Sequence, residues 1–196
     1  RAYCNFVFPE PDITRPLPMF DDGEILDEDI LDATSDINKI NNIDGLYTAD
    51  EVLNQPKSKK EIMRQYELDI QSSLRLLNEN KNIYFTPEKL NTYSPKFLNI
   101  LENVSDEEMI GLHLVYSQFR TLEGIGILKI ILDANNFTQF KIKKVNNIWS
   151  LDIEPENMIK PKYALYTGTE NDEEKEIIRN IFNNTWEFIP RTLRNE

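Results

Sequence analysis

Two short polar stretches hold the residues best suited to bind phosphate groups. Each stretch directly follows a short apolar run, and together they contain Ser117, Gln118, Arg120, Thr167, Gly168 and Thr169. Hydroxyl groups, backbone N–H groups and helix N-termini at such positions can hold the phosphates of a nucleic-acid strand without reading its sequence. The same residue types are also common as helix caps, so the residues alone leave both roles open.

Other kinds of functional site find little support in the sequence. His113 is the only histidine and Cys4 the only cysteine, so neither a zinc site nor a nucleophile paired with a histidine base can be assembled. The spacing of the six glycines never matches the phosphate-binding loop G-x-x-x-x-G-K-[ST]. His113 falls inside a predicted strand, and we expect it to be a packing residue.

The polar stretches belong to two predicted strand-to-helix units. The first is a buried strand at Leu112–Tyr116 followed by an apolar helix, in which Gly124 and Gly126 predict a close approach of the backbone. The second is the strand Tyr163–Tyr166, followed by an acidic helix that begins at Thr169. Two such units in series predict an α/β fold with a parallel sheet and crossover helices. Ligands of open α/β sheets bind at the carboxyl ends of the strands, where both polar stretches would lie.

The remaining helix signals lie between the acidic part of the chain and the first predicted strand. Apolar residues recur at helical spacing between Lys59 and Asn80, which predicts a helix with one apolar face. Thr86-Pro87 and Ser94-Pro95 each predict the start of a short helix. Ser105 and Glu108 have the spacing of a capping box, which we expect just before the strand.

A β-hairpin is predicted between the two strand-to-helix units. Phe137–Val145 and Ile148–Ile153 have strand-like composition, and Asn146-Asn147 between them tolerates the positive φ angles that a tight turn requires. The parallel sheet does not need this hairpin. We therefore interpret it as an insertion.

The negative charge of the chain is concentrated in one stretch. The net charge is −12, and the residues between Met19 and Leu53 include eleven acidic side chains against Lys39 alone, which amounts to −10. The rest of the chain is nearly neutral, so its acidity does not exclude contact with a polyanion elsewhere. We interpret the acidic stretch as a solvated linker, with docking to a basic protein partner as the alternative.

The amino-acid composition also indicates the cellular compartment of the protein. The sequence contains 40% hydrophobic residues, enough to build a core, and no apolar run long enough for a transmembrane helix. A single cysteine fits a reducing compartment. We therefore expect an intracellular protein without a membrane partner.

Four motifs in a fixed order resemble a known family. They are S-P-K-F, L-V-Y-S-Q-F, Y-A-L-Y-T-G-T-E and E-E-K-E-I-I-R-N-I-F-N. Together they resemble the second RecA-like domain of superfamily 2 helicases, in particular the Swi/Snf-like branch and the helicases of nucleocytoplasmic large DNA viruses. Leu114–Phe119 matches helicase motif IV, and Thr167–Lys175 resembles the turn and charged helix that follow, with Lys175 where that branch often has arginine. The resemblance covers residues 93–183, about half of the chain.

The resemblance implies an incomplete RecA-like parallel sheet with crossover helices, plus an acidic helical insertion and a β-hairpin insertion. It divides the chain into a connector (1–18), an acidic segment with a helical insertion (19–92) and a partial second RecA-like domain (93–196). The hairpin insertion lies near 137–153. The connector would leave the first RecA-like domain of the same polypeptide.

By the same resemblance, the chain is part of an ATP-dependent nucleic-acid helicase or translocase. The backbone of a DNA or RNA strand would be bound by Ser117, Gln118, Arg120, Thr167, Gly168, Thr169 and Lys175. ATP and Mg²⁺ would be cofactors of the intact enzyme, and this segment alone would bind neither. The ATP-binding loop would precede Arg1 and the arginine-finger motifs would follow Glu196, so we do not expect the segment to be active alone. A viral protein of this kind would act in a cytoplasmic virus factory or the virion. The alternative is a non-enzymatic interaction module that docks through the acidic stretch.

Overall fold

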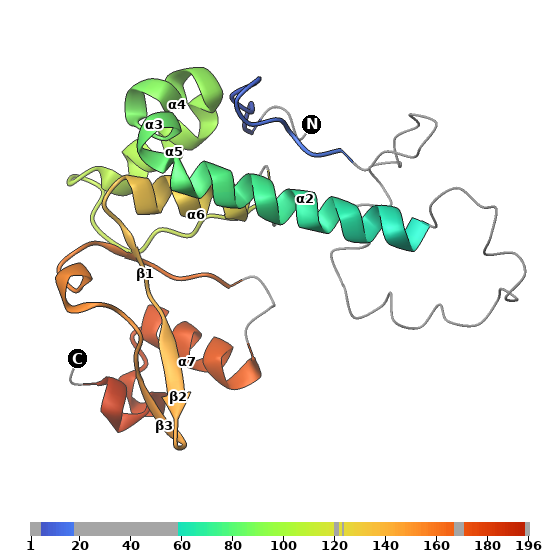
Figure 1. Ribbon diagram of the computed structural model, residues 1–196. Coiled ribbons are helices and arrows are strands. Elements are labelled where there is room, and N and C mark those ends of the chain that lie inside the picture. The colour runs from blue at the N-terminus through green and yellow to red at the C-terminus, as the bar shows by residue number, and fades with distance from the viewer. Residues whose placement is uncertain (1–4, 18–58, 120–121, 123, 167–170, 195–196) are drawn as a thin grey trace, which may run out of the picture.

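The computed structural model describes residues 5–17, 59–119, 122, 124–166 and 171–194 (Figure 1). Within these residues it is a mixed structure of helices and short strands, broadly α/β, with a very small parallel sheet. The acidic stretch 19–53 lies outside the described residues. So do four residues of the predicted interface, namely Arg120, Thr167, Gly168 and Thr169.

The first part of the structure is helical. It comprises α2 (Lys59–Glu79), α3 (Lys81–Tyr84), α4 (Pro87–Tyr93), α5 (Pro95–Ser105) and α6 (Ile125–Ala134). Figure 1 shows α2 and α6 side by side, with the three short helices gathered over one end of the pair. The predicted helix between Lys59 and Asn80 is confirmed as α2.

Local capping explains where the short helices begin. The side chain of Thr86 accepts a hydrogen bond from the N–H of Lys89, and that of Ser94 accepts one from the N–H of Phe97. Each cap is followed by proline at the first helical position, where the missing N–H costs nothing. Both predicted starts are therefore confirmed. The predicted capping box is wrong, because the Asp106 carboxylate, and not Ser105, accepts the N–H of Glu108 at 2.9 Å.

The apolar helix α6 lies at the centre of the main hydrophobic core. Its buried residues are Ile127, Leu128, Ile130, Ile131 and Leu132. Leu77 of α2 and Leu90 of α4 are fully buried in the same cluster. Each such side chain stabilises the fold by about 1.5–3 kcal/mol relative to an exposed position. The predicted apolar helix is therefore confirmed, and it is buried.

Residues 5–17, which belong to the predicted connector, pack onto this core. Phe6, Phe8 and Ile13 are buried in the main cluster. The N–H of Val7 donates a hydrogen bond to the carbonyl of Tyr93 at 2.8 Å, and the Ser94 hydroxyl donates to the carbonyl of Asn5. The aromatic side chains at the start of the chain thus fill core space next to the helices.

Two separate strand pairs follow α6. β1 (Thr138–Gln139) pairs in parallel with β4 (Lys162–Tyr163), and β2 (Ile142–Val145) pairs antiparallel with β3 (Ile148–Leu151). Asn146 and Asn147 have φ angles of 50° and 65°, which suit the tight turn of a two-residue hairpin. The predicted hairpin is therefore confirmed, but its first strand is divided, because β1 belongs to the parallel pair.

The predicted strand at Leu112–Tyr116 is wrong within this structure. These residues form neither helix nor strand, and Leu114 and Tyr116 are 86% and 88% exposed. The parallel partner of β4 is β1 instead, held by hydrogen bonds such as Phe140 N to Tyr163 O at 2.7 Å. Phe6 and Phe8 pack in the hydrophobic cluster around α6, and no residue of Leu112–Tyr116 is a member of that cluster. His113, which we expected to be a buried packing residue, is exposed as well.

A second, smaller hydrophobic cluster joins the hairpin to the last helical elements. These are α7 (Asp172–Phe182) and the single-turn 3₁₀ helices η4 (Trp186–Phe188) and η5 (Arg191–Leu193); another, η3 (Pro155–Asn157), precedes β4. The buried members of the cluster are Ile142, Trp149, Ile177, Ile189 and Leu193. The sequence placed the start of the last helix at Thr169. The structure instead caps it with Asn171, whose side chain accepts the N–H of Glu174 at 2.8 Å.

Candidate nucleic-acid interface

The turn at Ser117 is held by its own hydrogen bonds. The Ser117 hydroxyl donates to the carbonyl of Phe119 at 3.0 Å and accepts from the N–H of Phe119 at 3.2 Å. Such a side-chain-to-backbone pattern is a common way for serine to fix a turn. The single hydroxyl proton is therefore already used within the turn. Ser117 acts here as a positioning residue, and the exposed amide of Gln118 is the group that faces solvent.

The Ser117 turn is also tied directly to α6. The carbonyl of Phe119 accepts a second hydrogen bond, from the N–H of Ile125 at 3.1 Å. Gly124 makes this approach possible, because a Cβ atom at that position would lie 1.8 Å from the carbonyl oxygen of Phe119. The close backbone approach that the sequence predicted is confirmed at Gly124. The turn is thus attached to the first residue of a helix that is buried in the core.

Lys175 lies near the start of α7 in an acidic setting. Its ammonium group is 3.5 Å from the carboxylate of Asp172, which is fully exposed. Glu173 and Glu174 occupy the same first turn. Acidic side chains suit the positive end of the helix dipole, but they also lower the attraction of this helix end for a phosphate. The distance of 3.5 Å and the full exposure of Asp172 make this a weak ion pair.

The structure describes three of the seven predicted interface residues, and these lie on two different elements. Ser117 and Gln118 precede α6, whereas Lys175 lies on α7, which packs in the second cluster. Among the described residues, no hydrogen bond or ion pair joins the Ser117 turn to Lys175. We expected both polar stretches at one edge of a shared parallel sheet. Leu112–Tyr116 is not paired as a strand, so the described residues do not form that edge.

One cluster that the sequence did not predict connects the hairpin with α7. The ammonium group of Lys144 is 2.7 Å from the carboxylate of Glu173, and the indole N–H of Trp149 donates to the same carboxylate at 2.9 Å. The hydrogen bond from Lys144, and after it that from Trp149, lowers the pKa of Glu173 from its usual value. Lys144 and Trp149 are direct cross-strand partners, which follows from the two-residue turn. No sequence pattern near Glu173 predicts its contact with Lys144 and Trp149.

A second polar cluster fixes β4 against α6. The hydroxyl of Tyr163 donates to Asp133 at 2.6 Å, and the ammonium group of Lys129 lies 2.8 Å from the other oxygen of that carboxylate. Burial raises the pKa of Tyr163 well above its usual value, and the hydrogen bond to Asp133 adds to this effect. The cluster has a structural role, because all of its groups satisfy one another.

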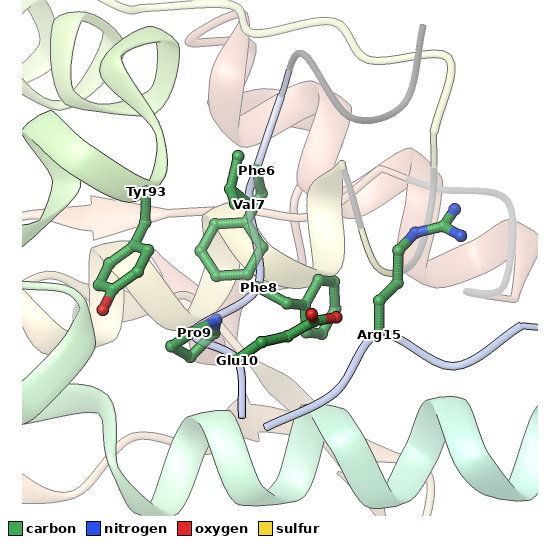
Figure 2. Close-up of a pocket in the computed structure, with 7 residues that line it drawn as sticks. All are labelled: Phe6, Val7, Phe8, Pro9, Glu10, Arg15 and Tyr93. Carbon is green, nitrogen blue, oxygen red and sulfur yellow. The ribbon is translucent and has the colours of Figure 1, made fainter. Parts of the chain in front are cut away.

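An open pocket lies on the N-terminal segment (Figure 2). It is lined by Phe6, Val7, Phe8, Pro9, Glu10, Arg15 and Tyr93. Figure 2 shows Tyr93 and Arg15 at opposite ends of the group, with Phe6, Phe8, Pro9 and Glu10 between them. No residue of the predicted interface lines this pocket.

Metal and membrane features are missing from the described part of the chain. Among these residues, no group of three or more histidine, cysteine, aspartate or glutamate side chains is arranged to hold a metal ion. None of the described helices combines the length and apolar character needed to span a bilayer.

No protein-family model, curated protein or solved structure matches this chain.

Proposed function

We propose that the chain is part of an ATP-dependent nucleic-acid helicase or translocase of superfamily 2, where it contributes to the backbone grip of the second RecA-like domain. The observation that supports this most is the Ser117 turn. It occupies the position that resembles motif IV, it is fixed to the first residue of a buried helix, and it leaves the amide of Gln118 exposed.

The turn is suited to a contact that does not read sequence. An amide side chain and free backbone N–H groups can bind phosphate oxygens of any strand. The turn is hydrogen-bonded to the first residue of α6, a helix of the core, so it would present the same groups to any strand. A movement of the whole domain would then carry the contact along the strand, as the two RecA-like domains close on ATP and open after hydrolysis.

The second contact in this proposal comes from Thr167, Gly168, Thr169 and Lys175, together with Arg120 beside the Ser117 turn. ATP and Mg²⁺ would bind elsewhere in the intact enzyme, because the sequence has no phosphate-binding loop. The first RecA-like domain of the same polypeptide would supply that loop. No hydrolytic step is assigned to residues of this chain.

Ultraviolet cross-linking tests which segments lie against the strand. The native polypeptide that carries these residues is irradiated with single-stranded DNA or RNA and digested with trypsin. We expect cross-links in the tryptic peptides 97–120 and 163–175, which contain the two polar stretches and the reactive aromatic residues Tyr116, Phe119 and Tyr166. Aromatic side chains beside a strand stack on its bases, which places them close enough to react.

An excess of unlabelled strand should remove these cross-links. Cross-links confined to the peptide 145–162, which contains part of the hairpin, would place the strand on another surface and contradict the proposal. A complete lack of cross-links with both DNA and RNA would contradict it as well.

A further inference from the structure

The residues from Ile110 to Tyr116, called here the 110–116 segment, expose large apolar side chains at every second position. The exposed fractions are 96% for Ile110, 70% for Leu112, 86% for Leu114 and 88% for Tyr116. The segment forms neither helix nor strand. A period of two is the pattern of a β-strand with one apolar face, and here that face has no cover among the described residues.

The charges beside the segment indicate what would cover it. Asp106, Glu107 and Glu108 precede it, separated from it only by Met109, and are exposed. Among the described residues, none of these three carboxylates forms an ion pair; Asp106 only accepts the N–H of Glu108. The 110–116 segment itself contains no aspartate, glutamate, lysine or arginine. An apolar strip that ends in negative charge is complementary to an apolar strand that ends in positive charge.

We propose that the 110–116 segment docks an extended strand from a partner polypeptide, with apolar residues at alternate positions and lysine or arginine after them. The partner strand would pair antiparallel, because such ladders are slightly more stable than parallel ones. Its C-terminal basic residues would then face Asp106, Glu107 and Glu108. Backbone hydrogen bonds would supply affinity, and the alternate side chains would supply specificity.

A second copy of the chain fits this surface less well. Each copy carries a net charge of −12, so two copies repel each other before they touch. A basic partner strand would instead be attracted by the same charge.

Synthetic peptides test the proposal on the native polypeptide. One fluorescent peptide has eight residues that alternate valine and threonine, followed by three lysines. A second ends in three glutamates, and a third carries the three lysines at its N-terminus. Fluorescence anisotropy should show that the first peptide binds at least about tenfold more tightly than the second at low salt, with a smaller difference at high salt.

Two variants locate the binding surface. Leu112→Lys combined with Leu114→Lys places charges on the apolar face and should abolish binding, as charged residues do on natural edge strands. Ile148→Lys is the matched control, because Ile148 is also apolar and is 58% exposed on the hairpin. Both changes affect exposed side chains, so neither should unfold the protein. The control should bind the first peptide as the unchanged protein does.

Several results would overturn the proposal. Equal binding of the lysine and glutamate peptides would remove the charge argument, and unchanged binding to the Leu112→Lys, Leu114→Lys variant would move the site elsewhere. Tighter binding of the third peptide would reject the antiparallel orientation. Sedimentation that shows a dimer which this double variant dissociates would make a second copy the occupant. A lack of binding by all three peptides would also reject the site.

Discussion

Replacing Phe85 with alanine should lower the free energy of unfolding by about 3–5 kcal/mol, the usual range for removing a buried phenylalanine. Phe85 has no exposed surface and lies in the main hydrophobic cluster. The centroid of its ring is 5.5 Å from that of Phe6, so the change removes a contact between the N-terminal segment and the helices. Phe85 belongs to the same cluster as the buried residues of α6, the helix to which the Ser117 turn is hydrogen-bonded.

Phe188→Ala is the matched control for this prediction. Phe188 is 68% exposed in the 3₁₀ helix η4, so its truncation should change stability by no more than about 0.5 kcal/mol. Urea denaturation followed by circular dichroism measures both variants. Equal effects at the two positions would contradict the described core, and in particular the packing of residues 5–17 on it.

Gly124→Ala is the second change with a large expected effect, about 3 kcal/mol of destabilisation. The new Cβ would lie 1.8 Å from the carbonyl oxygen of Phe119, which is a backbone atom and cannot turn away. The turn would have to open, and Ser117 and Ile125 would lose their shared acceptor. Denaturation curves measure the loss of stability.

Gly111→Ala is the control for this prediction, because it introduces backbone strain without a steric clash. Gly111 has a φ angle of +134°, but a Cβ there would meet no atom within 4 Å. Its substitution should therefore cost only the strain of the backbone, and less than the change at Gly124. A Gly124→Ala protein as stable as the unchanged one would contradict the closed turn.

The sequence predicted well those features that depend on neighbouring residues. The caps at Thr86 and Ser94 and the turn at Asn146-Asn147 use partners within four residues, and all three are present. The apolar helix α6 is also recognisable, because its composition alone requires burial. In contrast, Leu112–Tyr116 has the pattern of a buried strand, and only its pairing with a distant segment could have made it one.

Non-local contacts explain the rest of what the sequence did not predict. The predicted strand Tyr163–Tyr166 is found only in part, as β4 (Lys162–Tyr163), and its parallel partner β1 has two residues, too few to produce a periodic signal. Glu173 contacts Trp149 across 24 positions of sequence, and nothing in either neighbourhood indicates it. At the candidate site, the fixed turn at Ser117 follows from local chemistry. The position of this turn relative to Lys175 does not follow from local chemistry, because it depends on how α6 and α7 pack in different clusters.

The most direct test of the proposed function measures ATP hydrolysis by the native polypeptide that carries these residues, with and without nucleic acid. We expect Ser117→Ala combined with Gln118→Ala to lower the stimulation by nucleic acid, because the first change loosens the turn and the second removes its exposed amide. Gln71→Ala with Ser72→Ala is the matched control, since these two residues form an exposed pair of the same types on α2. The control should keep full stimulation. Unchanged stimulation in the Ser117, Gln118 variant, or an intact protein without nucleic-acid-dependent hydrolysis, would contradict the account.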